Sequence, residues 1–226
     1  MRRVIRWLLD LIYPPKCVLC HKLMDSSCSP VCQHCLDNLP DYDGADPHVR
    51  FADRCIATFS YQEPLRSSIH RFKFYGRRQY AEVYGDWMAV TIRDKLVGKF
   101  DLLTWAPVSR ERRKTRGYDQ AELLCRSVSR ALGVPMARTL RKVTNNTAQS
   151  TLQDAAMRAA NVRGVYEPYA PEVFQGKRLL LIDDIVTTGS TLSECSRVLL
   201  TAGAKSVVCA ALAAPEKNPD QKGEPL

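Results

Sequence analysis

The sequence contains no apolar run that approaches the roughly 20 residues required to cross a bilayer, so we expect no transmembrane segment. Its first 13 residues include basic side chains, but Arg6 and Asp10 interrupt the apolar run, and no small-residue cleavage site precedes Pro14. The apolar positions recur at helical spacing, which favours a short amphipathic helix over a secretion signal. We expect this helix to pack on the neighbouring domain, with membrane-surface contact as the alternative, and the protein to be cytoplasmic.

A Walker P-loop is also absent, because the pattern Gly-x4-Gly-Lys-Ser/Thr does not occur, and this disfavours NTP hydrolysis. We find no internal repeats. Hydrophobic residues make up 45% of the chain and charged residues 25%, which is typical of a globular protein rather than a disordered or fibrous one. With 226 residues, the chain can form one ordinary domain and a small appendage.

Acidic residues are outnumbered, with 24 Asp and Glu against 33 Lys and Arg, and the formal net charge is +9. This excess favours a polyanionic partner. A phosphate-rich metabolite and a nucleic acid both satisfy that condition, so the charge alone does not choose between them.

From residue 55 onward, strand-like and helix-like segments alternate. The predicted strands are residues 56–61, 102–106, 178–182 and 206–212, and the predicted helices are residues 80–96, 121–132 and 191–202. The later strands are uninterrupted apolar runs, and the helices between them are amphipathic. This pattern indicates a parallel sheet that is covered on both faces. The sequence therefore predicts a doubly wound α/β fold.

The nine cysteines are an odd number without a secretion signal, which argues against a disulfide framework. Cys17-x2-Cys20 and Cys32-x2-Cys35 are separated by eleven residues and can supply the four corners of a zinc site. Such a site has no open position, so its role would be structural, and the metal would supply the folding energy of the segment. A redox pair or unrelated thiols are the alternative. Three nearby residues could replace a cysteine as ligand: Cys28, His21 and His34.

The clearest functional pattern follows the apolar strand at residues 178–182. Asp183 and Asp184 come first, then the turn Thr-Thr-Gly-Ser-Thr at residues 187–191, then a helix. Backbone N–H groups and hydroxyls at a helix N-terminus can enclose a phosphate. The two carboxylates can accept hydrogen bonds from a ribose diol, directly or through Mg²⁺ and its waters. A 5-phosphoribosyl group has this arrangement, and a capping box from Thr191 to Glu194 supports a helix start at this turn. The alternative is a solvated turn whose hydroxyls are helix caps.

This segment resembles the signature of type I phosphoribosyltransferases: four apolar residues, two acidic ones and a Thr-Gly-rich loop. The chain as a whole, over roughly residues 10–213, resembles the ComF family of competence-related proteins, which join a four-cysteine zinc module to that domain. Further matching residues are Phe72-Lys73-Phe74-Tyr75-Gly76, the stretch 107–120, Gln149, Leu152, Arg158, Asn161 and Val162.

The resemblance implies a site for 5-phosphoribosyl 1-pyrophosphate (PRPP) with Mg²⁺. The implied PRPP-binding residues are Asp183, Asp184, Val186, Thr187, Thr188, Gly189, Ser190, Thr191, Ser109, Arg110 and Lys73. The implied catalytic residues are Asp183, Asp184, Arg116 and Lys114, the last two within a mobile loop at residues 112–116. Gln149, Arg158 and Asn161 would belong to a hood over the acceptor, with a polar surface segment as the alternative.

Residues 109–120 carry five cations and two acids. A solvated loop or a nucleic-acid patch would have this composition, but a phosphoribosyltransferase also needs cations where negative charge grows on departing pyrophosphate. The family usually shows Arg-Gly-Phe-Asn-Gln at positions 116–120, whereas this chain has Tyr118 and Asp119. The acid at position 119 lowers the local positive charge.

The implied function is Mg²⁺-dependent transfer of a phosphoribosyl group to an unknown acceptor, connected with DNA uptake and natural transformation. The alternative is a non-catalytic competence factor that senses PRPP or binds single-stranded DNA or proteins of the competence machinery. The expected organisation is an N-terminal helix plus zinc-ribbon module at residues 1–45, a phosphoribosyltransferase-like domain at 46–213, and a disordered tail at 214–226.

Overall fold

The computed structural model describes residues 14–24, 29–143 and 164–216. The predicted N-terminal helix and nearly all of the tail lie outside these residues, as do Cys28 and the hood residues Gln149, Arg158 and Asn161. Within the described ranges, no helix combines the length and apolarity needed to cross a membrane.

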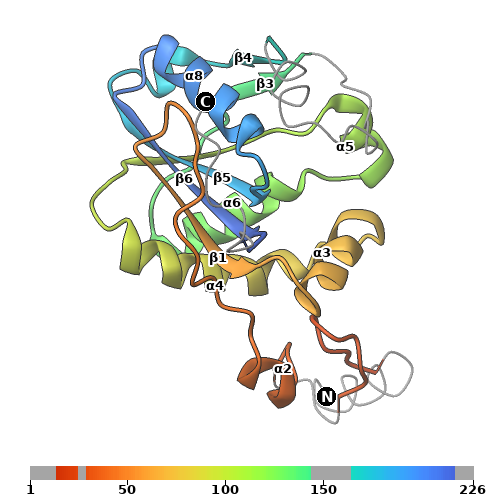
Figure 1. The fold of residues 1–226 in the computed structure, drawn as a ribbon. Coiled ribbons are helices and arrows are strands. Elements are labelled where there is room, and N and C mark those ends of the chain that lie inside the picture. Colours follow the sequence, from red (N-terminus) through yellow and green to blue (C-terminus); the bar gives the residue numbers. More distant parts are fainter. Residues whose placement is uncertain (1–13, 25–28, 144–163, 217–226) are drawn as a thin grey trace.

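The centre of the molecule is a four-stranded parallel sheet in the order β1-β6-β5-β2 (Figure 1). Its strands are β1 (Arg54–Ser60), β2 (Leu102–Trp105), β5 (Arg178–Ile185) and β6 (Ser206–Ala214). The helices are α2 (Gln33–Asp37), α3 (Leu65–Phe74), α4 (Tyr80–Lys95), α5 (Arg110–Arg116), α6 (Gln120–Leu132) and α8 (Ser190–Thr201). A short antiparallel ribbon pairs β3 (Leu140–Lys142) with β4 (Tyr166–Pro168), and a 3-10 turn covers Pro171–Val173.

Helices cover both faces of this sheet, as its apolar strands require. Successive strand residues point to opposite faces, so Leu180 and Ile182 pack in the cluster that contains the buried residues of α4 and α6. Leu179 and Leu181 pack in the cluster that contains the apolar face of α8. Leu179–Ile182 are all fully buried. The doubly wound α/β prediction is confirmed.

The strands and helices predicted within the described residues are all present, but three local expectations differ from the structure. Strand β5 continues to Ile185, so Asp183 and Asp184 lie inside the strand rather than after it. Residues 110–116, which the resemblance placed in a loop, form α5, because the Ser109 hydroxyl accepts from the amide of Arg112 and caps the helix.

The capping box at the start of α8 is wrong. The N-cap of α8 is Gly189, which adopts φ 71° and has no side chain to cap the helix; the Ser190 amide donates instead to the Thr188 hydroxyl at 3.4 Å. Glu194 instead accepts hydrogen bonds from the Gly164 amide at 2.9 Å and from Arg197 at 2.7 Å. Its carboxylate thus ties α8 to the segment that leads into β4.

Candidate functional site

Asp184 is the centre of a polar cluster at the carboxyl end of β5. Its Oδ2 lies 3.0 Å from the Lys73 ammonium and 3.3 Å from Nε2 of Gln120, which donates to it. The side chains of Lys73 and Asp184 are only 19% and 11% exposed, so water screens this ion pair weakly. Three elements therefore meet here: β5, the last turn of α3 and the first residue of α6.

Asp183 precedes it and accepts a hydrogen bond from the Asp184 amide through Oδ1 at 2.8 Å. Burial raises the pKa of Asp183, and the neighbouring Asp184 charge raises it further. A cation beside the pair would offset both effects. Gln120 Oε1 is also buried and has no hydrogen-bond partner among the described residues. Two carboxylates and a free amide oxygen are suitable ligands for hydrated Mg²⁺, so the residues present fit that ion.

The turn after β5 forms a small hollow of about 40 Å³, lined by Asp183 and residues 185–192. Thr187 and Thr188 are exposed, and the Thr188 and Ser190 hydroxyls lie 2.9 Å apart. The hollow lies at the N-terminus of α8, where backbone N–H groups have no intrahelical partner and the helix dipole favours an anion. Its size and donors suit one phosphate group.

A second hollow, of about 180 Å³, adjoins the first and shares Asp183 and Thr191 with it. Four cations line it: Lys73, Arg112, Arg116 and Lys142. Arg116 stacks over the Phe74 ring at 4.7 Å, and Lys142 lies 5.1 Å from the centre of the Tyr166 ring. Burial lowers the pKa of both Arg116 and Lys142. An anionic ligand would stabilise their charged forms.

A third hollow, of about 630 Å³, shares Pro107 and Val108 with the second as lining residues. Lys142 lines both. The third hollow contains Ser109 and four arginines: Arg110, Arg113, Arg138 and Arg141. Because neighbouring hollows share lining residues, the three lie one beside the next as a polar track at the carboxyl ends of the strands, where open parallel sheets bind ligands.

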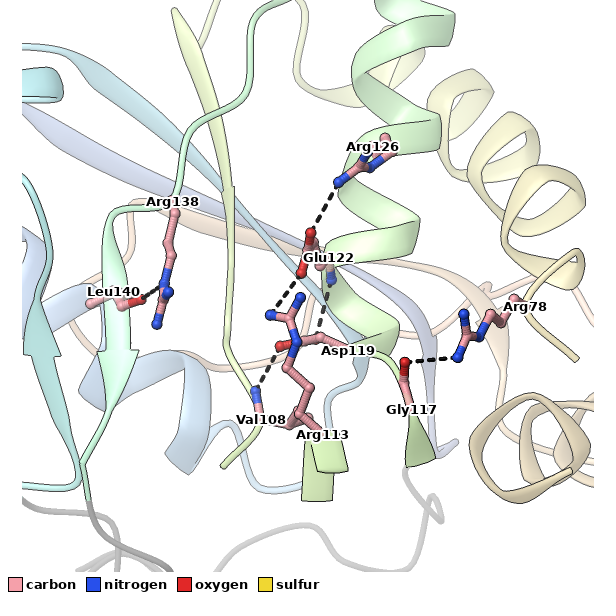
Figure 2. Close-up of polar contacts among 9 residues, drawn as sticks. All are labelled: Arg78, Val108, Arg113, Gly117, Asp119, Glu122, Arg126, Arg138 and Leu140. Atoms are coloured by element: carbon pink, nitrogen blue, oxygen red, sulfur yellow. Dashed lines mark hydrogen bonds and ion pairs between the residues drawn. The ribbon is translucent and has the colours of Figure 1, made fainter. Parts of the chain in front are cut away.

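Asp119, the departure from the family pattern, joins the loop after β2 to α6. Figure 2 shows its carboxylate between the Val108 amide and the first turn of α6. Oδ2 accepts from Val108 N at 2.9 Å, and Oδ1 accepts from Glu122 N at 3.2 Å. Glu122 in turn pairs with Arg113 and Arg126, at 3.1 and 3.0 Å. Burial raises the pKa of Asp119. Its role is therefore to cap α6 and to hold the backbone next to Ser109.

Tyr118, the other departure, caps α3. Its hydroxyl donates to the Phe72 carbonyl, and its ring lies 5.0 Å from the Arg78 guanidinium. Arg78 also donates to the Gly117 carbonyl at 2.8 Å. A phenylalanine at position 118 would keep the ring contact but lose the bond to α3.

The structure brings most of the predicted site residues together. Asp183, Asp184, Thr191, Lys73 and Arg116 line the second hollow. Residues 186–190 line the first, and Ser109 and Arg110 line the third. Lys114 is exposed on α5 and is not among the described residues that line these hollows.

Four residues that line the second hollow were not predicted individually from the sequence: Gln120, Arg112, Lys142 and Tyr166. Gln120 lies in the basic segment 109–120, and Arg112 was expected only as the first residue of the loop at 112–116. Lys142 and Tyr166 belong to the β3–β4 ribbon, which carries no recognisable motif.

The four predicted zinc ligands converge. The Sγ atoms of Cys17, Cys20, Cys32 and Cys35 all lie within 4.8 Å of one another, and those of Cys20 and Cys32 are 3.8 Å apart. Four sulfurs at about 2.3 Å from a central zinc ion would be about 3.8 Å apart in a tetrahedron. The amide of Cys32 also points at Cys17 Sγ, at 3.4 Å, as a donor to a thiolate would. The cluster therefore fits a zinc ion.

Comparisons with known proteins agree with this geometry. Residues 119–225 match the family model described as phosphoribosyl transferase domain. The DNA utilization protein YhgH of Escherichia coli K12 is 28% identical, over 78% of this chain and 74% of that protein. Competence protein F of Haemophilus influenzae is 29% identical, over 78% of this chain and 75% of that protein.

Among solved structures, a purine phosphoribosyltransferase from Pyrococcus horikoshii aligns with 65% of this chain and 80% of its own. The identity is 17% and the TM-score 0.38, too low to add to the description of the fold. The domain match covers the diacid and the phosphate turn, and the relatives extend over more than three quarters of the chain. These matches support a protein of the ComF family, and residues 119–225 belong to a domain of the phosphoribosyltransferase type.

Proposed function

We propose that this protein binds PRPP with Mg²⁺ and transfers its phosphoribosyl group to an acceptor, releasing pyrophosphate. The observation that carries the proposal is the track of three hollows, in which a phosphate-sized turn, a buried diacid and an arginine-rich pocket follow one another. PRPP has the same sequence of groups: a 5-phosphate, a ribose diol and a pyrophosphate. No covalent nucleophile is required in this reaction.

Each hollow would hold one part of the substrate. The turn at residues 187–191 would bind the 5-phosphate, and the diacid would accept hydrogen bonds from the ribose hydroxyls. Ser109 and Arg110 would face the pyrophosphate, with Arg116 and Lys142 between them and the diacid. Bound Mg²⁺ would neutralise charge on the pyrophosphate oxygens and on the diacid.

In the reaction, the acceptor would form a bond to C1 of the ribose while the C1–O bond to pyrophosphate breaks. The electron pair of that bond leaves with pyrophosphate, so negative charge grows at the third hollow. Fixed guanidinium groups lower the barrier when they are already aimed at this position. Asp119 contributes indirectly, because it fixes the Val108 backbone beside Ser109.

The proposal is tested by titrating PRPP with Mg²⁺ into the wild-type chain and into the double variant Asp183→Asn, Asp184→Asn. Calorimetry should show saturable binding to the wild type and a loss of at least tenfold in the variant. The matched control is Asp101→Asn, whose carboxylate pairs with Arg178 at the opposite end of β5. Unchanged affinity in the double variant would exclude the diacid as part of the site.

Turnover is tested separately, by following pyrophosphate release with and without candidate acceptors. Release that depends on both PRPP and an acceptor would support transfer. Binding of PRPP without pyrophosphate release in the presence of any acceptor would instead support a PRPP sensor. The names of the relatives, which refer to competence and to DNA utilization, suggest that the reaction or the sensor serves DNA uptake.

A second candidate function is binding of single-stranded DNA or of a competence partner. The observation that favours it is an aromatic and cationic surface at the end of α3, where Phe74 and Tyr75 are 56% and 64% exposed beside Arg77 and Arg78. Bases stack on such rings while cations bind the backbone. DNA affinity that does not fall between low and moderate salt would contradict this electrostatic binding.

The cysteine cluster, in turn, would hold a structural Zn²⁺ ion. All four ligand positions are protein thiolates, so no coordination site remains for a substrate or water. The cluster lies in a module whose buried residues, including Leu19 and Val31, join the core cluster beside α3. Zinc would therefore order this module against the domain.

A further inference from the structure

Helix α3 lies between the cysteine module, which carries α2, and the rest of the domain (Figure 1). Two residues of its last turn make contacts on opposite sides of the helix: Arg71 with the cysteine module and Lys73 with Asp184. Arg71 and Lys73 are separated by about 200° around the helix axis, so one can face the module while the other faces the diacid. The end of α3 thus touches both proposed sites.

The contact with the module is made by side chains of α3 and main-chain carbonyls of the first cysteine knuckle. Nη2 of Arg71 donates to the carbonyl of Leu19 and, at 3.3 Å, to that of Val18. Ser68 also donates to the Val18 carbonyl through its hydroxyl. Val18 and Leu19 are the two residues between Cys17 and Cys20, so these carbonyls are positioned by the cysteine cluster itself.

The contact with the diacid is the ion pair between Lys73 and Asp184, at 3.0 Å. Lysine loses about 2 kcal/mol of rotamer entropy when it is fixed in one conformation. That loss is smaller when the backbone beneath the side chain is already held in place. Arg71 and Lys73 are two residues apart in the same helix, so their two contacts are joined through a short, rigid piece of backbone.

We propose that Arg71 is a positioning residue for PRPP binding. It ties the end of α3 to the first cysteine knuckle and so keeps the Lys73 ammonium within reach of Asp184 and of the ligand. The cysteine module is then a structural determinant of affinity at the PRPP site. This inference rests on the proposed function, since it concerns the affinity of the same site.

The test is a double-mutant cycle on the full chain, with the dissociation constant of PRPP and Mg²⁺ measured by calorimetry. The variants are Arg71→Ala, Lys73→Ala and the combination, and the control is Arg66→Ala, an exposed arginine on the same helix. Lys73→Ala should weaken binding about tenfold to a hundredfold, the size expected for a hydrogen bond to a charged group. Arg71→Ala should weaken it about threefold to tenfold, and Arg66→Ala should leave it unchanged.

The decisive result is the combination. If Arg71 acts through Lys73, Arg71→Ala should cause no further loss in the Lys73→Ala background. A merely structural role would lower the melting temperature and the fraction of binding-competent protein in both backgrounds. Equal loss in both backgrounds, or no loss in either, would overturn the inference.

Two further measurements keep the result interpretable. If Arg71→Ala does not fold, Arg71→Gln retains one amide donor for the knuckle carbonyls and should give a smaller effect of the same pattern. Zinc content, measured on every variant, should stay at the wild-type level, because the four cysteines are unchanged. Absence of PRPP binding by the wild type would refute the proposed function, whereas wild-type binding with an effect of Lys73 alone would refute only this inference.

Discussion

Gly189→Ala should destabilise the protein more than alanine at a glycine that also has a positive φ but has free space around an added Cβ. Gly189 has φ 71°, a conformation that costs a residue with a Cβ about 1–2 kcal/mol. A Cβ at this position would also lie 2.4 Å from the carbonyl oxygen of His48 and 3.3 Å from Val49. The His48 oxygen belongs to the backbone, so a side-chain rotation cannot relieve the contact.

Such overpacking adds about 1–3 kcal/mol, and the total loss should be about 2–5 kcal/mol. For a domain of this size, that corresponds to a fall in melting temperature of roughly 4–20 °C. The matched control is Gly133→Ala, at the end of α6. Gly133 has φ 69° but no atom within 4 Å of the added Cβ, so only the conformational cost applies, or roughly 2–8 °C.

Thermal and urea unfolding, monitored by circular dichroism, measure both variants. PRPP affinity provides a second readout: because the backbone clash must displace the phosphate turn or residues 48–49, Gly189→Ala should lose at least tenfold, and Gly133→Ala less than twofold. Equal destabilisation by the two substitutions would show that the packing of residues 48–49 on the turn is not as tight as the structure indicates. Normal PRPP affinity in Gly189→Ala would show that this turn does not take part in PRPP binding.

Three further predictions concern the residues that support the site. Tyr118→Phe removes the hydroxyl that donates to Phe72 and should cost about 0.5–1.5 kcal/mol of unfolding free energy in urea titrations; no change would mean that water replaces the bond. Asp119→Asn leaves one oxygen acceptor for two amide donors and should cost about 1–3 kcal/mol. Because burial raises the pKa of Asp119 in the folded state, its protonated form stabilises the fold below the unfolded pKa of about 4, and this contribution is lost as pH rises through the folded pKa. The cost of Asp119→Asn should therefore shrink as pH rises over that window, and a cost that grew with pH would refute the assignment. Cys32→Ser should reduce zinc, measured by atomic absorption on anaerobically purified protein, to less than half an ion per chain, whereas Cys125→Ser, in α6, should retain the full wild-type content.

Sequence reasoning worked best where the chemistry is contiguous in the chain. The diacid, the phosphate turn and α8 follow one another within 20 residues, so their order alone predicts a strand, a ligand site and a helix. The two cysteine pairs are equally local, and the four thiols converge as their spacing predicts. In both cases, the backbone between the functional groups is too short to allow many arrangements.

It worked less well where distant segments contribute one side chain each. Lys142 reaches the site from a three-residue strand, and its partner Tyr166 comes from another. Neither strand is long enough to show a period of two, and pairing of the two is a long-range event that local propensity does not encode. Lys73 illustrates the same limit, since helical spacing does not reveal that its face of α3 meets Asp184.

The capping box failed for a related reason. Thr191 and Glu194 have the right spacing, but Glu194 bonds the amide of Gly164, which is 30 residues away. A carboxylate that is buried without a hydrogen-bond donor is costly, and the tertiary structure supplies a donor to Glu194 from the distant Gly164 amide. The start of α8 is then left to Gly189, which has no side chain, and the Thr188 hydroxyl, 3.4 Å from the Ser190 amide, accepts from one N–H group of the first turn. A helix that begins at a glycine keeps its other first N–H groups available, and a site that binds a phosphate needs such donors.

Positions 118 and 119 extend this argument to the family pattern. Read from the sequence, Tyr118 and Asp119 are substitutions in a basic loop, and the acid only subtracts charge. In the structure, each has a partner that the sequence does not indicate: Tyr118 bonds Phe72, 46 residues away, and Asp119 bonds Val108. Both partners lie next to proposed ligand contacts, Lys73 and Ser109. Tyr118 and Asp119 therefore hold the backbone next to Lys73 and Ser109. Their substitution should alter PRPP affinity by displacing these two residues and not by changing the local charge.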